Sequence, residues 1–154
     1  MNRKFAAVLV AIALGGLVGG RAWGHCQIPC GIYDDDARFT LMLEHVTTIE
    51  KSMKQVKELS KAKGADKNQL VRWVNNKEHH ASELAEIITF YFMAQRVKPV
   101  STEDAAAHQA YTRKVTVLHQ MLVQTMKAKQ STDVARCADL RKLVGEFKAL
   151  YLAK

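Results

Sequence analysis

The spacing of apolar side chains most narrows the fold that this chain can adopt. After residue 40, apolar residues recur alternately four and three positions apart, at Met42, Val46, Ile49, Met53 and Val56. Because an α-helix turns once every 3.6 residues, this spacing places all five on one helix face. Three later segments repeat the period, and no segment alternates as a half-buried strand does. The sequence therefore predicts an all-α protein.

Short polar segments separate the four apolar stretches. They contain helix stop and start signals: Gly64, the capping box of Asp66 with Gln69, Pro99 with Ser101 or Thr102 as the next N-cap, and the cap Ser131, Thr132 and Asp133. The inward residues expected in the later helices are Leu70, Trp73, Val74, Leu84, Ile87, Ile88 and Tyr91, then Tyr111, Val115, Leu118, Leu122 and Met126, then Cys137, Leu140, Val144, Phe147 and Tyr151. Since short linkers join antiparallel neighbours, we expect an antiparallel four-helix bundle over residues 34–154.

The first 24 residues differ from the rest and are typical of a secretory signal peptide. Arg3 and Lys4 precede an uncharged apolar run of about 14 residues, and Ala22 and Gly24 provide the small residues of a cleavage site. The run is shorter than the roughly 20 residues of a spanning helix, so a retained membrane anchor is the weaker interpretation. We expect cleavage after Gly24, export to the periplasm or the extracellular space, and no stable membrane insertion afterwards.

The composition favours one globular domain, with 48% hydrophobic and 25% charged residues. Without the leader, 20 basic and 15 acidic residues remain, and both signs are spread over every expected helix. A nucleic-acid-binding protein usually gathers its basic residues on one face, so nucleic acid is not an expected partner. A mild positive charge does favour small anions.

The nine residues after the leader, HCQIPCGIY at positions 25–33, are hereafter the hook. Cleavage after Gly24 would make His25 the first residue, which then offers its α-amine and its imidazole. Cys26 and Cys30 add two thiolates, and the Cys26 backbone amide adds another nitrogen. A planar site of two nitrogens and two sulfurs, with the imidazole as axial ligand, is typical of Ni(II) or Cu(II), whereas zinc prefers four tetrahedral side-chain ligands.

Three other residues of the hook suit such a site. Pro29, directly before the second thiolate, helps the chain reverse, and Gly31 turns at low steric cost. The phenol of Tyr33 lies just beyond the loop, where it could offer a proton or a hydrogen bond at the open side of a metal.

The sequence HCQIPCGIY resembles the nickel hook of the nickel-containing superoxide dismutases, His-Cys-x-x-Pro-Cys-Gly-x-Tyr, at every fixed position. The segments EHVTTIEKSM, QLVRWVNNKEHHASEL and LVQTMKAKQSTD resemble that family's bundle helices more weakly. The resemblance implies an enzyme that disproportionates superoxide at a Ni(II)/Ni(III) centre. It also implies a homohexamer of four-helix bundles with one nickel ion in each subunit.

The resemblance also implies a role for each residue of the site. His25 would bind nickel through its amine and axial imidazole, Cys26 through its amide nitrogen and thiolate, and Cys30 through its thiolate. Tyr33 would screen the open coordination face, which completes the expected catalytic set. Some family members orient the axial histidine with a glutamate and an arginine. For those roles the sequence offers only candidates, namely Glu44, Arg38 and Arg72.

Two other interpretations of the hook stay open. Cys26 and Cys30 could form a disulfide in a purely structural bundle, because exported thiols tend to pair. An exported nickel or copper carrier would use the same ligands without turnover. Outside the hook, the neighbours His79 and His80 could suggest another metal site, but adjacent helix residues point about 100° apart, so a polar surface or a subunit contact is expected instead. We expect structural or surface roles for His45, His108 and His119, and buried positions for Cys137 and the methionines Met42, Met53, Met121 and Met126.

Overall fold

A computed structural model describes residues 35–64 and 66–153 of the chain. They form α2 (Asp35–Lys61), α3 (Lys67–Glu86), the π-helix η1 (Ile87–Arg96), α4 (Ala105–Gln130) and α5 (Ala135–Leu152), and no strand occurs in these two ranges. The all-α prediction is confirmed. The leader and the hook, predicted for residues 1–24 and 25–33, lie outside the described residues.

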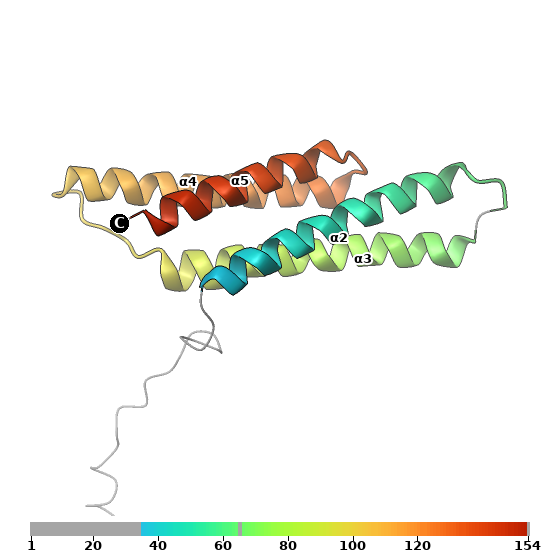
Figure 1. Ribbon diagram of the computed structural model, residues 1–154, viewed down its shortest axis with the longest axis horizontal. Coiled ribbons are helices and arrows are strands. Elements are labelled where there is room, and N and C mark those ends of the chain that lie inside the picture. The colour runs from blue at the N-terminus through green and yellow to red at the C-terminus, as the bar shows by residue number, and fades with distance from the viewer. Residues whose placement is uncertain (1–34, 65, 154) are drawn as a thin grey trace, which may run out of the picture. The chain divides into compact units, whose positions relative to one another are not determined.

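The four long helices form an antiparallel bundle. Both α2 and α4 pack against α3 and against α5. Figure 1 shows that consecutive helices run in opposite directions and that η1 continues α3 towards the end of the bundle where α2 begins. The predicted four-helix bundle is thus confirmed, with an unpredicted π-helical turn in its second helix.

Aromatic side chains fill the core at the end where α2 begins. The ring centroid of Phe92 on η1 lies 5.0 Å from that of Phe39 on α2 and 4.9 Å from that of Phe147 on α5. All three phenylalanines are fully buried, and Tyr151 packs against each of them. Aromatic pairs at these separations contribute about 0.5–1.5 kcal/mol each beyond their burial. The start of α2 is therefore seated on a rigid aromatic cluster.

The buried face of α3 lies further along the helix than the apolar pattern predicted. Val74 is 36% exposed, and Leu70 and Trp73 are only half-buried. The fully buried face starts instead at Lys77 and continues through Ala81. The prediction for Leu70, Trp73 and Val74 was wrong. The core position further along α3 belongs to Lys77, whose ammonium group has hydrogen-bond partners in Glu78 and Ala128.

The inward face of α4 also differs from the prediction near its end. Met126 was expected inside and is 48% exposed. Met121, Thr125 and Ala128 form the buried face there, at spacings of four and three residues. Thr125 satisfies its hydroxyl within the helix by donating to the carbonyl of Met121 at 2.8 Å, so a polar residue is tolerated in the core.

The helix caps were predicted in part. The side chain of Asp66 accepts from the backbone N–H of Asn68 at 2.8 Å, which confirms it as the N-cap of α3. The N-cap of α4 is Asp104, and not Ser101 or Thr102. Its carboxylate accepts the backbone N–H three residues later at 3.0 Å, a bond that also favours the helix dipole.

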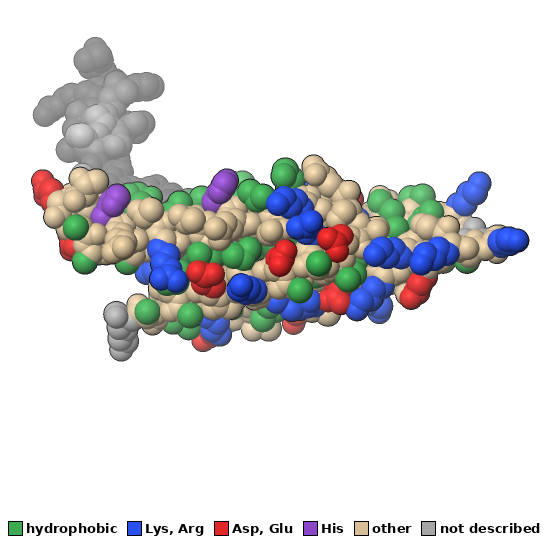
Figure 2. All heavy atoms as spheres, turned by 90° about the horizontal axis from the view of Figure 1, so that it is seen from above, with side chains coloured by type: hydrophobic (Ala, Val, Ile, Leu, Met, Phe, Trp, Pro, Cys, Tyr) green, Lys and Arg blue, Asp and Glu red, His purple; other side chains and the backbone are tan. Residues whose placement is uncertain are grey.

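The bundle surface is charged and mixed in sign. Figure 2 shows basic and acidic side chains interleaved over one face. This distribution agrees with the expectation of a solvated surface rather than a single basic patch. Among the helices of residues 35–64 and 66–153, none has the length and apolarity needed to cross a bilayer.

Candidate metal centre

The predicted ligands His25, Cys26 and Cys30 and the predicted catalytic Tyr33 all lie outside the described residues. Within residues 35–64 and 66–153, no group of three or more His, Cys, Asp or Glu side chains could hold a metal ion. The part of the chain that the structure describes therefore contains no rival to the hook. What it does describe is the first turn of α2, which begins at Asp35, two residues after the hook in the sequence.

The donor set predicted for the hook suits nickel by its chemistry. It would join two soft thiolates with amine, amide and imidazole nitrogens, and planar nitrogen-containing sites are typical of Ni(II) and Cu(II). Cys26 and Cys30 are two of the three cysteines in the chain. The third, Cys137, is fully buried on α5, as predicted.

Cys137 is not a candidate ligand. Burial raises the pKa of its thiol to about 11, and its Sγ lies 3.8 Å from the Sδ of Met53 in the core. Cys137 is fully buried, and no group of three or more His, Cys, Asp or Glu side chains in residues 35–64 and 66–153 could hold a metal ion, so this thiol lacks the co-ligands that a nickel site needs.

The carboxylate of Asp35, the first residue of α2, is held by three side chains from two other elements. Its Oδ1 accepts from the Tyr91 hydroxyl at 2.7 Å and from Arg96 Nε at 2.9 Å. Its Oδ2 accepts from Arg96 Nη2 at 2.7 Å and from the Tyr151 hydroxyl at 2.9 Å. Hereafter these four residues are the Asp35 clamp. Each carboxylate oxygen thus accepts two hydrogen bonds.

The electrostatics of the Asp35 clamp favour the ionised carboxylate. Burial alone would raise the pKa of Asp35, but hydrogen bonds from Arg96, Tyr91 and Tyr151 outweigh it and hold the pKa below its usual value. Burial and the bond to Asp35 raise the pKa of Tyr91 to about 12, and burial likewise raises the pKa of Tyr151. Both phenols therefore stay protonated and act as donors at neutral pH.

Basic side chains surround this end of the bundle. The guanidinium of Arg38 lies 4.8 Å from the ring centroid of Tyr91, at cation–π distance. Lys148 pairs with Asp36 at 2.6 Å and lies over the Phe39 ring. Of the three candidates for orienting the axial histidine, Arg38 is thus near the Asp35 clamp. Glu44 lies more than two turns along α2, and Arg72 is exposed on α3.

A histidine pair between α2 and α3 was missed by the sequence analysis. Nδ1 of His45 lies 2.9 Å from Nδ1 of His80, and His45 is only 7% exposed. Burial lowers the pKa of both imidazoles, and charge repulsion lowers it further, from His80 for His45 and from His79 for His80. One sequence signal existed: His45 follows Met42 by three residues and so lies on the buried face of α2.

Comparison with known proteins bears directly on the hook. A family model described as nickel-containing superoxide dismutase matches residues 20–154, a range that contains the whole hook and all described helices. No curated protein and no solved structure matches the chain.

Proposed function

The chain belongs to the nickel-containing superoxide dismutase family, and on that premise we propose that the hook at residues 25–33 is its metal centre. The protein is a superoxide dismutase with a nickel cofactor, and it converts superoxide to dioxygen and hydrogen peroxide. One observation supports the placement of the site above all: the matched range contains HCQIPCGIY, the only segment with two closely spaced cysteines in the sequence.

The proposed ligands all come from the start of the processed chain. His25 would hold nickel through its α-amine and imidazole, Cys26 through its amide nitrogen and thiolate, and Cys30 through its thiolate. An α-amine at position 25 exists only after cleavage behind Gly24, so the complete ligand set forms only once the leader has been removed. Export of the chain before this cleavage is part of the same proposal.

Bound nickel supplies a one-electron Ni(III)/Ni(II) couple that oxidises one superoxide ion to dioxygen and reduces a second one. Reduction of the second superoxide ion consumes two protons and gives hydrogen peroxide. The phenol hydroxyl of Tyr33, three residues after Cys30, would supply a proton donor for this step. A net positive surface raises the local concentration of the anionic substrate, and salt weakens this attraction.

A homohexamer is the proposed assembly, by resemblance to the family. The described surface carries apolar side chains that association would bury, with Val71 and Phe90 each 55% exposed on α3 and η1. Burying such side chains between subunits would favour association roughly in proportion to the apolar area removed from water.

The ligand set is tested by adding one glycine before His25, in a protein made to start there. This addition moves the free amine away from the imidazole and Cys26 while leaving every side chain in place. We expect superoxide decay, followed after a pulse of superoxide, to fall to the rate of the protein without nickel, with an unchanged unfolding temperature.

The matched controls are Cys30→Ser, which removes one thiolate, and Cys137→Ala, which removes the buried thiol. Cys30→Ser should lose activity like the extended protein, whereas Cys137→Ala should keep its nickel and its activity. Full activity in the extended protein would overturn the proposed ligation. Nickel binding without superoxide decay in the unaltered protein would point to a carrier instead.

A further inference from the structure

We propose that Asp35 is a positioning residue for nickel, because the Asp35 clamp fixes the point at which the hook leaves the bundle. This inference rests on the proposed function of the hook. Asp35 touches neither nickel nor substrate in this account. Its role is to hold one end of the metal-binding segment still while the ligands assemble.

The contacts of the Asp35 clamp exceed what a helix start needs. An aspartate in the first turn is already favoured by the helix dipole, and the exposed Asp36 beside it fills that role while pairing with Lys148. Asp35 instead reaches across the bundle to partners 56, 61 and 116 residues away in the sequence. A carboxylate that joins three separate elements by four hydrogen bonds fixes its own backbone within the bundle.

The π-helix η1 places Tyr91 and Arg96, two of the hydrogen-bond partners of Asp35, on the same side of the helix. In an α-helix, residues five apart point about 140° away from each other, since each residue turns the chain by about 100°. In a π-helix the hydrogen bond joins residues five apart, so side chains at that separation lie nearly above one another. Tyr91 and Arg96 are five apart within η1, and Val97 N–H donates to Phe92 O at 2.8 Å, which is the π-helical pattern.

A π-helix costs stability relative to an α-helix, and such turns are frequent at functional sites. Here it produces one result that an α-helix does not, namely that Tyr91 and Arg96 both donate to the same oxygen of Asp35. The aromatic cluster beneath, with Phe92 fully buried on the same element, holds η1 in place. The π-helix, the aromatic packing against it and the four hydrogen bonds therefore all hold the Asp35 carboxylate in place.

The hook is joined to this carboxylate by a short length of chain. Tyr33 lies two residues before Asp35, and the proposed ligand Cys30 lies five residues before it. Five residues span at most about 18 Å. Fixing one end of so short a tether removes conformations that the ligands would otherwise lose on binding nickel, which strengthens binding without adding a ligand.

The test compares Asp35→Asn with Asp36→Asn, in processed protein that starts at His25. Both variants remove one negative charge from the first turn of α2, but only Asp35→Asn breaks the Asp35 clamp. Nickel is titrated into the metal-free protein by calorimetry, and the thiolate-to-nickel absorption bands are recorded. Unfolding temperatures of the metal-free variants identify a temperature at which both are fully folded.

For Asp35→Asn we expect the Kd for nickel to rise about tenfold, which corresponds to the backbone entropy of about one residue set free before binding, together with altered absorption bands. Asp36→Asn should stay within about twofold of the unaltered protein. Arg96→Lys keeps the charge but loses the two-pronged contact, so it should fall between them. Because it is a milder change, it tests the inference even if Asp35→Asn does not fold.

Cys30→Ser separates this inference from the proposed function. If Cys30→Ser binds nickel as well as the unaltered protein does, the hook is not the metal centre and the proposed function fails. If Cys30→Ser abolishes binding while Asp35→Asn and Arg96→Lys match Asp36→Asn in Kd and spectrum, the hook stands and the positioning role of Asp35 is overturned.

Discussion

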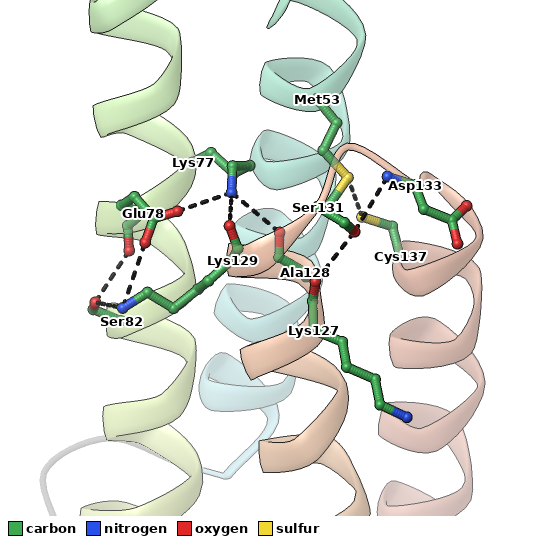
Figure 3. Close-up of polar contacts among 10 residues, drawn as sticks. All are labelled: Met53, Lys77, Glu78, Ser82, Lys127, Ala128, Lys129, Ser131, Asp133 and Cys137. Atoms are coloured by element: carbon green, nitrogen blue, oxygen red, sulfur yellow. Dashed lines mark hydrogen bonds and ion pairs between the residues drawn. The ribbon is translucent and has the colours of Figure 1, made fainter. Parts of the chain in front are cut away.

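Lys77 offers the sharpest test of how the bundle is held together, because it is a charged residue at a core position of α3. Its side chain is 5% exposed, and its ammonium donates to the carbonyls of Ala128, at 3.2 Å, and Lys129 in the last turn of α4. It also pairs with Glu78 at 2.8 Å. Figure 3 shows these bonds converging on one nitrogen. Lys77 therefore caps a neighbouring helix from its side.

The variant Lys77→Met keeps the length and apolar stem of the side chain and removes the donor. Each buried carbonyl left without a partner costs about 1–3 kcal/mol, and two are affected. Relief from burying an ammonium group offsets part of this cost. We expect a net loss of about 2–3 kcal/mol in the free energy of unfolding, which lowers Tm by roughly 6–12 °C for a domain of this size.

Urea unfolding followed by circular dichroism measures the change, with Lys54→Met as the matched control. Lys54 makes an exposed pair with Glu50 one turn away on α2, and its side chain is 57% exposed. Its loss should cost no more than about 0.5 kcal/mol. If Lys77→Met were as stable as Lys54→Met, the capping role derived for Lys77 would be wrong.

Three further outcomes are expected. Burial lowers the pKa of His45 and His80 below 6.5, so the unfolded chain binds more protons than the native one between about pH 6.5 and the lowered native pKa values. Stability should hold above about pH 6.5, fall as the pH drops from there to the native pKa values and level off below them, and a His45→Gln/His80→Gln variant should show a flatter pH dependence in urea unfolding. Phe92→Ala should cost about 3–5 kcal/mol in the same assay, and a loss below 1 kcal/mol would contradict its place in the core. Cys137→Ala should bind one nickel per subunit by metal analysis, and a loss of nickel from the folded variant would contradict the exclusion of its thiol as a ligand.

The sequence predicts best those features that depend on residues close together along the chain. The stripe through Met42, Val46 and Ile49 is buried as expected, because helical spacing alone determines which face they share. The donor set predicted for the hook is contiguous, so it was proposed from the sequence alone; it lies outside the described residues and stays a prediction. Both inferences need only residues within a few turns or a few peptide bonds of one another.

The features that were missed depend on contacts between distant segments. Lys77 is not among the inward residues that the sequence predicts, since nothing nearby indicates that the end of α4 supplies its acceptors. His45 and His80 are 35 residues apart and meet only when α2 and α3 pack. The Asp35 clamp joins residues up to 116 positions apart and depends on a π-helix, for which the sequence of η1 carries no evident local signal.

The central claim is that the processed chain begins at His25 and holds nickel in its hook. The most direct measurement is a native mass spectrum of the protein recovered from the exported fraction, followed by the mass of the released subunit. We predict a subunit that starts at His25, with both hook thiols reduced and one nickel ion per subunit in the intact assembly. A subunit that begins upstream, or one that begins at His25 with Cys26 and Cys30 joined and no metal bound, would contradict the account.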